Sequence, residues 1–261
     1  MTMLLVQSVR SEWLKQKRSL TTWLVVGAAF FIPTLIAFVR LVRPAGLPEL
    51  YRAAGFWERL WTQSWESMSV FIMPLVIMLG ASLIAQLEFR NNTWKQVHAT
   101  PQPFAAIYIA KLVIILAMVV QLFAWFNLAI YLSAIVPPLV FARVDYPVSP
   151  IPFALFLRQN ASFFIDVLPI VGLQYLLALR FRNFMVPMGV GMAVWITAIG
   201  ALPWEYNYAI PYAHAVIDYT MTVQSRVSHA VPAPVPVIAS CYFAAFVVVG
   251  YLLYVYKGDK G

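Results

Sequence analysis

Residues 112–136 read LVIILAMVVQLFAWFNLAIYLSAIV, an apolar run without a single charged side chain. A helix rises about 1.5 Å per residue and the hydrocarbon core of a bilayer is about 30 Å thick, so roughly 20 such residues cross it. The composition of the whole chain agrees with this reading. Of its 261 residues, 62% are hydrophobic and 11% are charged, whereas about a quarter are charged in a typical soluble domain. The chain is therefore expected to be an integral membrane protein.

Five further apolar runs reach the length of a membrane span. Together with the first run they give six expected spans, at about 20–39, 68–87, 112–136, 161–179, 184–202 and 237–256. Several of them contain proline, which helices in bilayers tolerate better than soluble helices do. We therefore expect an all-α integral membrane protein in which residues 1–261 form a single transmembrane domain.

The charged residues between the spans predict the orientation. With the N-terminus inside, the inner segments hold eleven basic and three acidic residues, and the remaining seven basic and seven acidic residues balance. An excess of Lys and Arg marks the cytoplasmic side of a membrane protein. Both termini are therefore expected in the cytoplasm. The net charge of +8 follows from the same rule, so we expect no nucleic-acid partner.

Residues 2–18 precede the first expected span. At about 100° per residue, four apolar residues share one arc of a helix and the basic residues lie outside it. The apolar arc comprises Leu5, Val6, Val9 and Trp13. This pattern predicts an interfacial amphipathic helix in the headgroup layer. The alternative is a plain basic flank that only sets the topology.

The segments after the first and third spans are longer than turns. Within residues 40–67, an apolar stripe at helical spacing predicts an amphipathic helix on the outer leaflet. The stripe comprises Leu50, Ala54, Trp57 and Trp61. Residues 137–160 contain five prolines and cannot form one regular helix.

Residues 203–236 form the longest outer segment. Pro211 is suited to the first turn of a short helix, so we expect one or two outer amphipathic or re-entrant helices before the last span. Tyr212 and Tyr219 are among the aromatic residues that suit the headgroup level.

Missing motifs narrow the function. The chain has no G-x-x-x-x-G-K-[ST], so it lacks a phosphate-binding loop, and it has no H-E-x-x-H or G-x-S-x-G. Three histidines, interpreted as polar surface residues of loops, are His98, His214 and His229. The single cysteine, Cys241, excludes an internal disulfide. We therefore expect neither an enzyme nor a metal or cofactor bound by this chain.

Few polar side chains lie within the expected spans. Asp166 is the only acid, about five residues from the outer end of its span; it either serves a substrate or ion, or faces the headgroups. Gln121, Asn127 and Gln174 are expected to hydrogen-bond between helices by default. The four residues together are the candidates for a substrate path. Ion-coupled carriers keep ionisable residues deep in the membrane, and the sequence shows no pair of them.

Residues 88–111, EFRNNTWKQVHATPQPFAAIYIAK, interrupt the apolar pattern on the inner side. Thr93-x-x-Gln96 has the spacing of a capping box, and Pro101 ends any helix that begins there. A short capped helix that presents Trp94 among basic residues is suited to insertion into a groove on a soluble partner. The alternative is a surface helix whose tryptophan lies in the lipid interface.

These features resemble the permease subunits of type-two ABC exporters. The pattern of that family is an acid, a T/S-W-K-like helix, a proline turn and a lysine at the next span; the matching positions are Glu88, Thr93-Trp94-Lys95, Pro101 and Lys111. Ser11-Glu12-Trp13-Leu14-Lys15 is similar to the family's opening E-x-x-K signature. The Trp94-Lys95 version looks most like the branch linked to lantibiotic immunity and bacitracin resistance.

The resemblance implies a subunit of the bacterial cytoplasmic (inner) membrane whose ATP hydrolysis takes place on another chain. Two permease chains, identical or related, would assemble with two ATPase subunits that bind ATP and Mg. The residues that would couple the permease to the ATPase are Glu88, Thr93, Trp94, Lys95, Gln96, Val97, His98 and Pro101. The interfacial helix, with Glu12, Trp13 and Lys15, would lie beside the same ATPase.

The apolar spans favour an amphiphilic cargo, such as an antimicrobial peptide, a lipid or another hydrophobic compound. Two other classes stay open from the residues alone. One is an ion-coupled carrier or channel, and the other is a structural subunit of a larger membrane complex.

Overall fold

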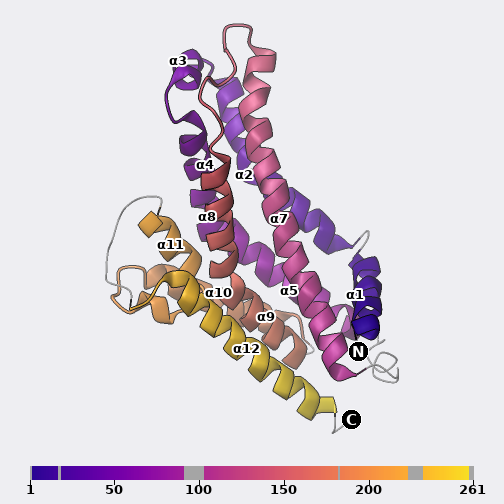
Figure 1. The fold of residues 1–261 in the computed structure, drawn as a ribbon. Coiled ribbons are helices and arrows are strands. Elements are labelled where there is room, and N and C mark those ends of the chain that lie inside the picture. Colours follow the sequence, from indigo (N-terminus) through magenta and orange to yellow (C-terminus); the bar gives the residue numbers. More distant parts are fainter. Residues whose placement is uncertain (1, 17–18, 91–102, 182, 223–231, 259–261) are drawn as a thin grey trace.

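The computed structural model describes residues 2–16, 19–90, 103–181, 183–222 and 232–258. Every regular element in these ranges is a helix, which confirms the all-α expectation. Helix α2 (Leu20–Val42) runs beside α7 (Phe104–Val140), and α12 (Val235–Gly258) packs along α9 (Leu168–Arg180) (Figure 1). The two ends of the described chain lie at the same end of the molecule (Figure 1).

Five helical stretches are long and apolar enough to cross a membrane: Leu20–Val42, Phe56–Gln86, Phe104–Val140, Phe153–Arg180 and Val235–Tyr256. The expected span at 184–202 is instead the 16-residue helix α10 (Met185–Gly200). Asn183 Oδ1 accepts a hydrogen bond from the Met185 N–H at 2.9 Å and fixes its start, and Pro203 disfavours helix in the residue before it. The expectation of six full-length spans is therefore not confirmed.

The expected outer helix within residues 40–67 is two helices, α3 (Leu47–Arg52) and α4 (Phe56–Ser67). Gly55 separates them with a φ of 71°, a left-handed conformation that glycine adopts without a Cβ clash. The tryptophan stripe is not on the surface: Trp57 and Trp61 are 6% and 1% exposed. The sequence pattern of an apolar stripe is the same whether lipid or protein covers it. In this structure, other parts of the protein cover Trp57 and Trp61.

Helix α4 continues through a π-helical turn, Met68–Ile72, into α5 (Met73–Arg90). Pro74 has no N–H to donate to the Val70 carbonyl, four residues earlier in the chain. The indole N–H of Trp195 in α10 donates to that oxygen at 2.9 Å. The freed backbone group is thus satisfied by a neighbouring helix, as an apolar interior requires.

Helix α7 is the central and longest helix, with 37 residues. At 1.5 Å per residue it is about 55 Å long, well beyond the roughly 30 Å of a bilayer core. Contrary to the expected end of the third span at 136, it includes Pro137 and Pro138. Pro138 frees the Ala134 carbonyl, and the Tyr51 hydroxyl donates to it at 2.9 Å.

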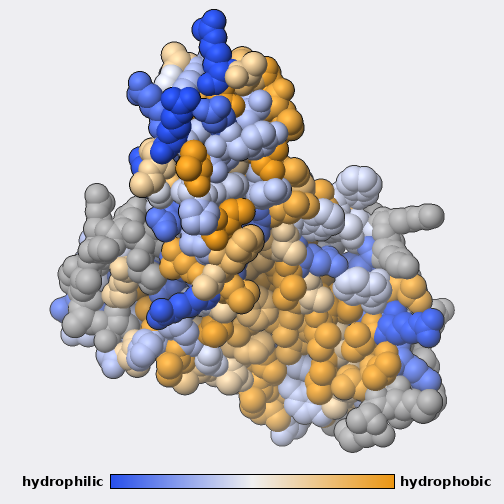
Figure 2. Space-filling model, turned by 45° about the horizontal axis from the view of Figure 1, so that its top comes forward, coloured by the Kyte–Doolittle hydropathy of each residue, from blue (hydrophilic) through white to orange (hydrophobic). Residues whose placement is uncertain are grey.

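One end of the molecule projects beyond the rest of the bundle. The upper ends of α2 and α7, together with α3, extend past α10, α11 (His214–Thr222) and α12 (Figure 1). Hydrophilic residues gather on this projecting end, and apolar residues cover much of the middle of the visible face (Figure 2). Residues 141–152, which connect α7 to α8 (Phe153–Asp166), contain no helix.

An aromatic core joins α4, α7 and α8. Its members are Trp61, Trp65, Phe123, Phe126 and Phe163, all at most 6% exposed. The ring centroid of Trp65 lies 5.1 Å from that of Phe123, 5.2 Å from that of Phe126 and 4.7 Å from that of Phe163. The pairs with Phe123 and Phe126 are edge-on and the pair with Phe163 is stacked, at separations that aromatic pairs prefer.

Residues 203–222, the first described part of the segment expected on the outer side, pack inward against the bundle. They contain a 3-10 turn (Asn207–Ala209) and α11, which begins three residues after Pro211. Tyr212 and Tyr219, expected at the headgroup level, are each 1% exposed, and His214, interpreted as a surface residue, is 0% exposed. These corrections share one cause, because α11 packs against α8 and α12.

Candidate coupling joint and ligand cavity

The segment predicted to contact an ATPase falls largely outside the described residues. Thr93, Trp94, Lys95, Gln96, Val97, His98 and Pro101 all lie in residues 91–102, and their placement is not described. The structure does place the two helices that bracket this segment. Helix α5, which contains Glu88, ends at Arg90, and α7 resumes at Phe104.

Helix α1 (Thr2–Gln16) is bound to α7 by buried charges. The Glu12 carboxylate accepts from Lys111 Nζ at 3.2 Å through Oε2 and from Lys15 through Oε1. Glu12 and Lys111 are only 5% and 2% exposed. We call these three residues the coupling joint. Removing one partner of such a buried ion pair strongly destabilises the fold, because the other charge is left buried without a partner.

The joint corrects the sequence interpretation of Lys111. That residue was expected to open the third span, but α7 begins at Phe104, so Lys111 lies two turns inside the helix. It is the residue at which α1 meets the helix that follows the segment 91–102. Sequence reasoning singled out Glu12, Lys15 and Lys111 separately and missed their contact. The available signal was that Glu12 is the only acid in the first 48 residues.

The orientation of α1 is unusual for a helix on a protein. Its polar residues Ser8 and Glu12 are buried against the bundle, whereas Val6 is 66% and Trp13 is 40% exposed. An apolar face that points away from the protein needs another apolar environment. The predicted interfacial position of this helix would supply one.

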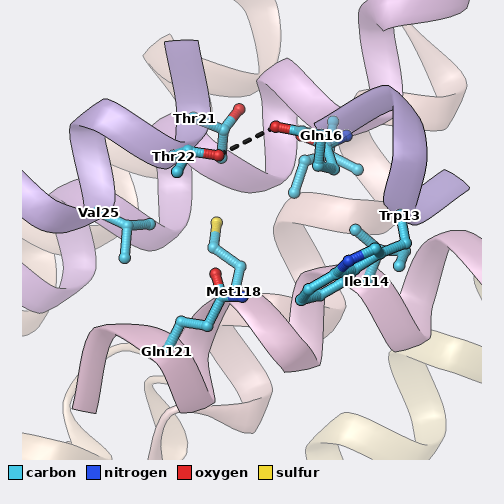
Figure 3. Close-up of a pocket in the computed structure, with 9 residues that line it drawn as sticks. Trp13, Gln16, Thr21, Thr22, Val25, Ile114, Met118 and Gln121 are labelled. Carbon is cyan, nitrogen blue, oxygen red and sulfur yellow. Dashed lines mark hydrogen bonds between the residues drawn. The ribbon is translucent and has the colours of Figure 1, made fainter. Parts of the chain in front are cut away.

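A cavity of about 320 Å³ lies where α1, α2, α5 and α7 meet. We call it the N-terminal cavity; its lining residues are Trp13, Gln16, Thr21, Thr22, Val25, Ile84, Ile114, Met118 and Gln121. Figure 3 shows the Gln121 side chain rising from α7 beside Met118, and the Trp13 indole reaching in from α1. The size falls within the range of about 300–1,000 Å³ that is usual for small-ligand sites.

The polar groups of this cavity are only partly satisfied. The Thr22 hydroxyl donates to the Gln16 carbonyl at 3.0 Å, the bond drawn in Figure 3. Within the described parts of the chain, neither the Gln121 amide nor the Thr21 hydroxyl has a hydrogen-bond partner. Gln121 was expected to bond another helix, and no described residue of another helix bonds it.

A second cavity, of about 670 Å³, lies between α4, α7 and α8. We call it the aromatic cavity, because its walls include Trp57, Trp61, Phe123, Tyr131 and Phe156. Its two amides, Asn127 and Asn160, bond each other at 2.8 and 3.2 Å and also bond the carbonyls one turn back in their own helices. Asn127 therefore behaves as expected, as a helix–helix link.

Asp166 and Gln174 lie in neither cavity. Gln174 Nε2 donates to the Pro187 carbonyl of α10 at 3.2 Å, as expected of a polar residue between helices. Asp166 is 0% exposed at the break between α8 and α9, so it does not face the headgroups. It lies beside Asp218 of α11, whose carboxylate accepts from Ser162 at 2.9 Å. The four candidates for a substrate path are thus not brought together at one site.

Residues 8–199 match the model of a family described as ABC-2 family transporter protein. The match extends from α1 to α10 and covers well over half of the chain. The chain belongs to the ABC-2 transporter family. A comparison with curated proteins finds no match. As an ABC-2 permease the chain is a multi-pass membrane component of an ABC transporter, a transport subunit rather than an enzyme, and the family implies an ATPase partner.

The family match locates the joint and the cavity within the shared part of this ABC-2 permease. Glu12, Lys111 and the whole lining of the N-terminal cavity lie inside residues 8–199. Helices α11 and α12 lie outside that range. Asp218, which lies beside the buried Asp166, is therefore supplied by a part of the chain outside the family match.

Proposed function

We propose that this ABC-2 permease is the membrane subunit of an exporter that moves an amphiphilic substrate out of the cytoplasm or the inner membrane. ATP and Mg bind on a separate ATPase, and a second permease chain, identical or related, completes the pathway. Both termini lie in the cytoplasm. An antimicrobial peptide or a lipid-like compound is the expected cargo, in keeping with the branch linked to lantibiotic immunity and bacitracin resistance.

One observation carries the proposal of mechanical coupling: the buried contact between Glu12 and Lys111. Lys111 lies two turns after the start of α7, and α7 follows the proposed coupling segment 91–102 directly. A displacement of that segment by the ATPase would act on the first turns of α7 and, through the ion pair, on α1. The permease would then shift between inward and outward access, with the ATP-bound motor favouring one of the two states.

The test is the substitution Trp94→Ala, with Lys95→Glu as a second variant. Both should lower ATP-driven transport and substrate-stimulated ATPase activity in reconstituted vesicles, while the permease still inserts into the membrane. Trp204→Ala is the matched control, because Trp204 is 51% exposed and lies in the connection after α10. If the coupled ATPase activity of both variants equalled that of the control, the assignment of the coupling segment would be wrong.

An ion-coupled carrier gains one specific observation from the structure. The sequence showed no pair of buried ionisable residues, but the fold brings Asp218 beside Asp166. The variant Asp166→Asn separates the two functions. In this variant, an ATP-driven exporter should keep ATP-dependent transport when no ion gradient is present. An ion-coupled carrier would lose its gradient-driven transport in this variant, and ATP would not restore it.

A further inference from the structure

Two polar side chains face the N-terminal cavity without a hydrogen-bond partner among the described residues. A side-chain amide or hydroxyl that faces an apolar cavity gains a hydrogen bond when a ligand supplies the partner that the protein does not. The Gln121 amide offers two donors and one acceptor, and the Thr21 hydroxyl is in a residue only 6% exposed. Neither finds a partner among the described residues. Both line the same cavity, so a ligand in that cavity could satisfy them together.

The lining also defines the charge of such a ligand. No charged side chain of the described residues lines the cavity, and its walls are completed by Val25, Ile84, Ile114 and Met118. The nearby charges of the coupling joint are engaged with one another. Among the lining residues that the structure describes, a charged headgroup would find no counter-ion, whereas an uncharged hydrogen-bonding group would find the Gln121 amide and the Thr21 hydroxyl.

The size and the position of the cavity define the rest of the ligand. A volume of about 320 Å³ holds a small polar group with the beginning of an apolar chain, but not a whole lipid. Trp13, which closes one side, is 40% exposed, and the cavity lies beside α2, whose most apolar stretch is only 22% buried. An apolar chain that leaves the cavity there would reach the surface that α1 and α2 present to the bilayer.

We propose that the N-terminal cavity binds the uncharged, hydrogen-bonding end of a membrane-derived amphiphile, with Gln121 and Thr21 as its polar ligands. The apolar chain of the amphiphile lies outside the cavity, along α2. The site deepens the proposed export function, on which its role in transport rests. Binding itself requires only the permease and can be tested without an ATPase.

The wall of the cavity offers a way to fill it without touching its polar groups. A Cβ added at Gly80 of α5 would lie 2.8 Å from Met118 Cε and nearer still to its sulfur. The flexible end of Met118 must therefore move, and Met118 lines the cavity. Gly80→Ala should thus change the shape of the site by way of a side chain that can adjust at low cost.

The experiment is photolabelling of the purified permease in lipid nanodiscs with a diazirine-bearing monoacylglycerol. This probe has an uncharged headgroup with two hydroxyls and one ester. We expect saturable labelling of peptides from α1, α2 and α7. Gln121→Leu and the isosteric Thr21→Val should each weaken the apparent affinity about tenfold, the effect of one lost hydrogen bond to a ligand. Gly80→Ala should weaken it as well.

The controls make each outcome decisive. Gln63→Leu and Thr197→Val remove the same groups outside the N-terminal cavity and should label like the wild type. A lysophosphatidic acid that carries the same diazirine should label weakly; equal labelling would overturn the uncharged headgroup. Labelling that is unaffected by Gln121→Leu, Thr21→Val and Gly80→Ala alike would overturn the site. If labelling follows the proposal but ATP-driven transport is absent, the binding site stands and the export function fails.

Discussion

The two halves of α7 are held by different kinds of contact. Near its start, Lys111 bonds the carboxylate of a separate amphipathic helix, and ten residues later Gln121 faces a cavity without a partner. In its second half, Phe123 and Phe126 pack around Trp65, and Asn127 is fully bonded to Asn160 and to its own helix. The first half thus contacts α1 through the coupling joint, packs on α9 and α12 through the rings around Tyr108, and borders the N-terminal cavity. The second half borders the aromatic cavity and packs into the aromatic core around Trp65.

This difference suggests that the two halves of α7 respond differently to a displacement of the helix. Close-packed interiors resist small displacements, because any shift loses many contacts at once. A joint made of one ion-pair network beside a cavity can be rearranged by altering few contacts. If the proposed coupling segment acts as expected, the ion pair of the joint is the contact that it reaches first, and the aromatic core around Trp65 lies farther along the same helix.

The largest expected effect is on the aromatic core. Trp65→Ala removes a side chain that is 0% exposed and touches four other rings. The free energy of unfolding should fall by about 3–5 kcal/mol, the usual cost of deleting a buried aromatic side chain. Thermal unfolding in detergent measures it. Trp204→Ala, at an exposed position, should change the unfolding temperature little; an equal loss in both variants would refute the assignment of the core.

A somewhat smaller effect is expected at the coupling joint. Glu12→Gln removes the acid that Lys111 and Lys15 both contact, and breaking a buried ion pair costs on the order of 3 kcal/mol. The loss should appear as release of α1, measured by how fast trypsin removes the N-terminal peptide. Lys111→Met should release α1 as well, because Lys15, the other partner of Glu12, lies on α1 itself. Arg10→Gln, an exposed change on the same helix, should have no effect, and release in that variant too would count against the joint.

The sequence predicted local structure well where one physical signal dominated. Three of the longest apolar runs became α2, α7 and α12, with ends displaced by at most eight residues. The shift is largest at the start of α7, where Phe104–Lys111 was assigned to the inner segment because it contains a lysine. The buried Glu12 removes the reason for that lysine to be in water, and this partner is 99 residues away in the sequence.

Other failures also come from contacts between distant segments. An apolar stripe such as Trp57 and Trp61 does not distinguish lipid from protein as its covering, and only the packing of α4 on α7 and α8 decides it. The pairing of Asp166 with Asp218 likewise depends on the inward folding of α11. Within the candidate site, the sequence identified Glu12, Trp13, Lys15 and Gln121 but could not show that they surround one joint and one cavity.

A pH-dependent effect is expected where α11 folds inward. Burial lowers the pKa of His214 below its ordinary value of 6.5, so the folded protein keeps this histidine neutral. As the pH falls below about 6.5, the unfolded chain gains a proton that the folded chain does not, and stability declines by at most about 1.4 kcal/mol per pH unit. Unfolding measured between pH 7.5 and 5 (roughly the range in which histidine titrates) should show this decline.

The contribution of His214 is isolated by difference, because other groups of the protein titrate over part of the same range. His214→Gln should flatten the pH dependence, and it retains a donor for the Tyr208 carbonyl, which His214 Nε2 contacts at 2.8 Å. A wild-type slope that is unchanged in His214→Gln would mean that this histidine is not held neutral by the fold.

The smallest effect compares the two amides of α7 directly. Polar contacts between membrane helices are worth about 0.6 kcal/mol on average, so a double-mutant cycle of Asn127→Ala and Asn160→Ala should return a coupling energy of that order. Gln121→Leu should cost no stability and should slightly raise it, since an unbonded amide is replaced by an apolar group beside Met118. Unfolding of the single and double variants in the same detergent measures both quantities. If Gln121→Leu lost as much stability as Asn127→Ala, the Gln121 amide would be bonded as well as the Asn127 amide. The difference between the two halves of α7 would then not hold for their amides.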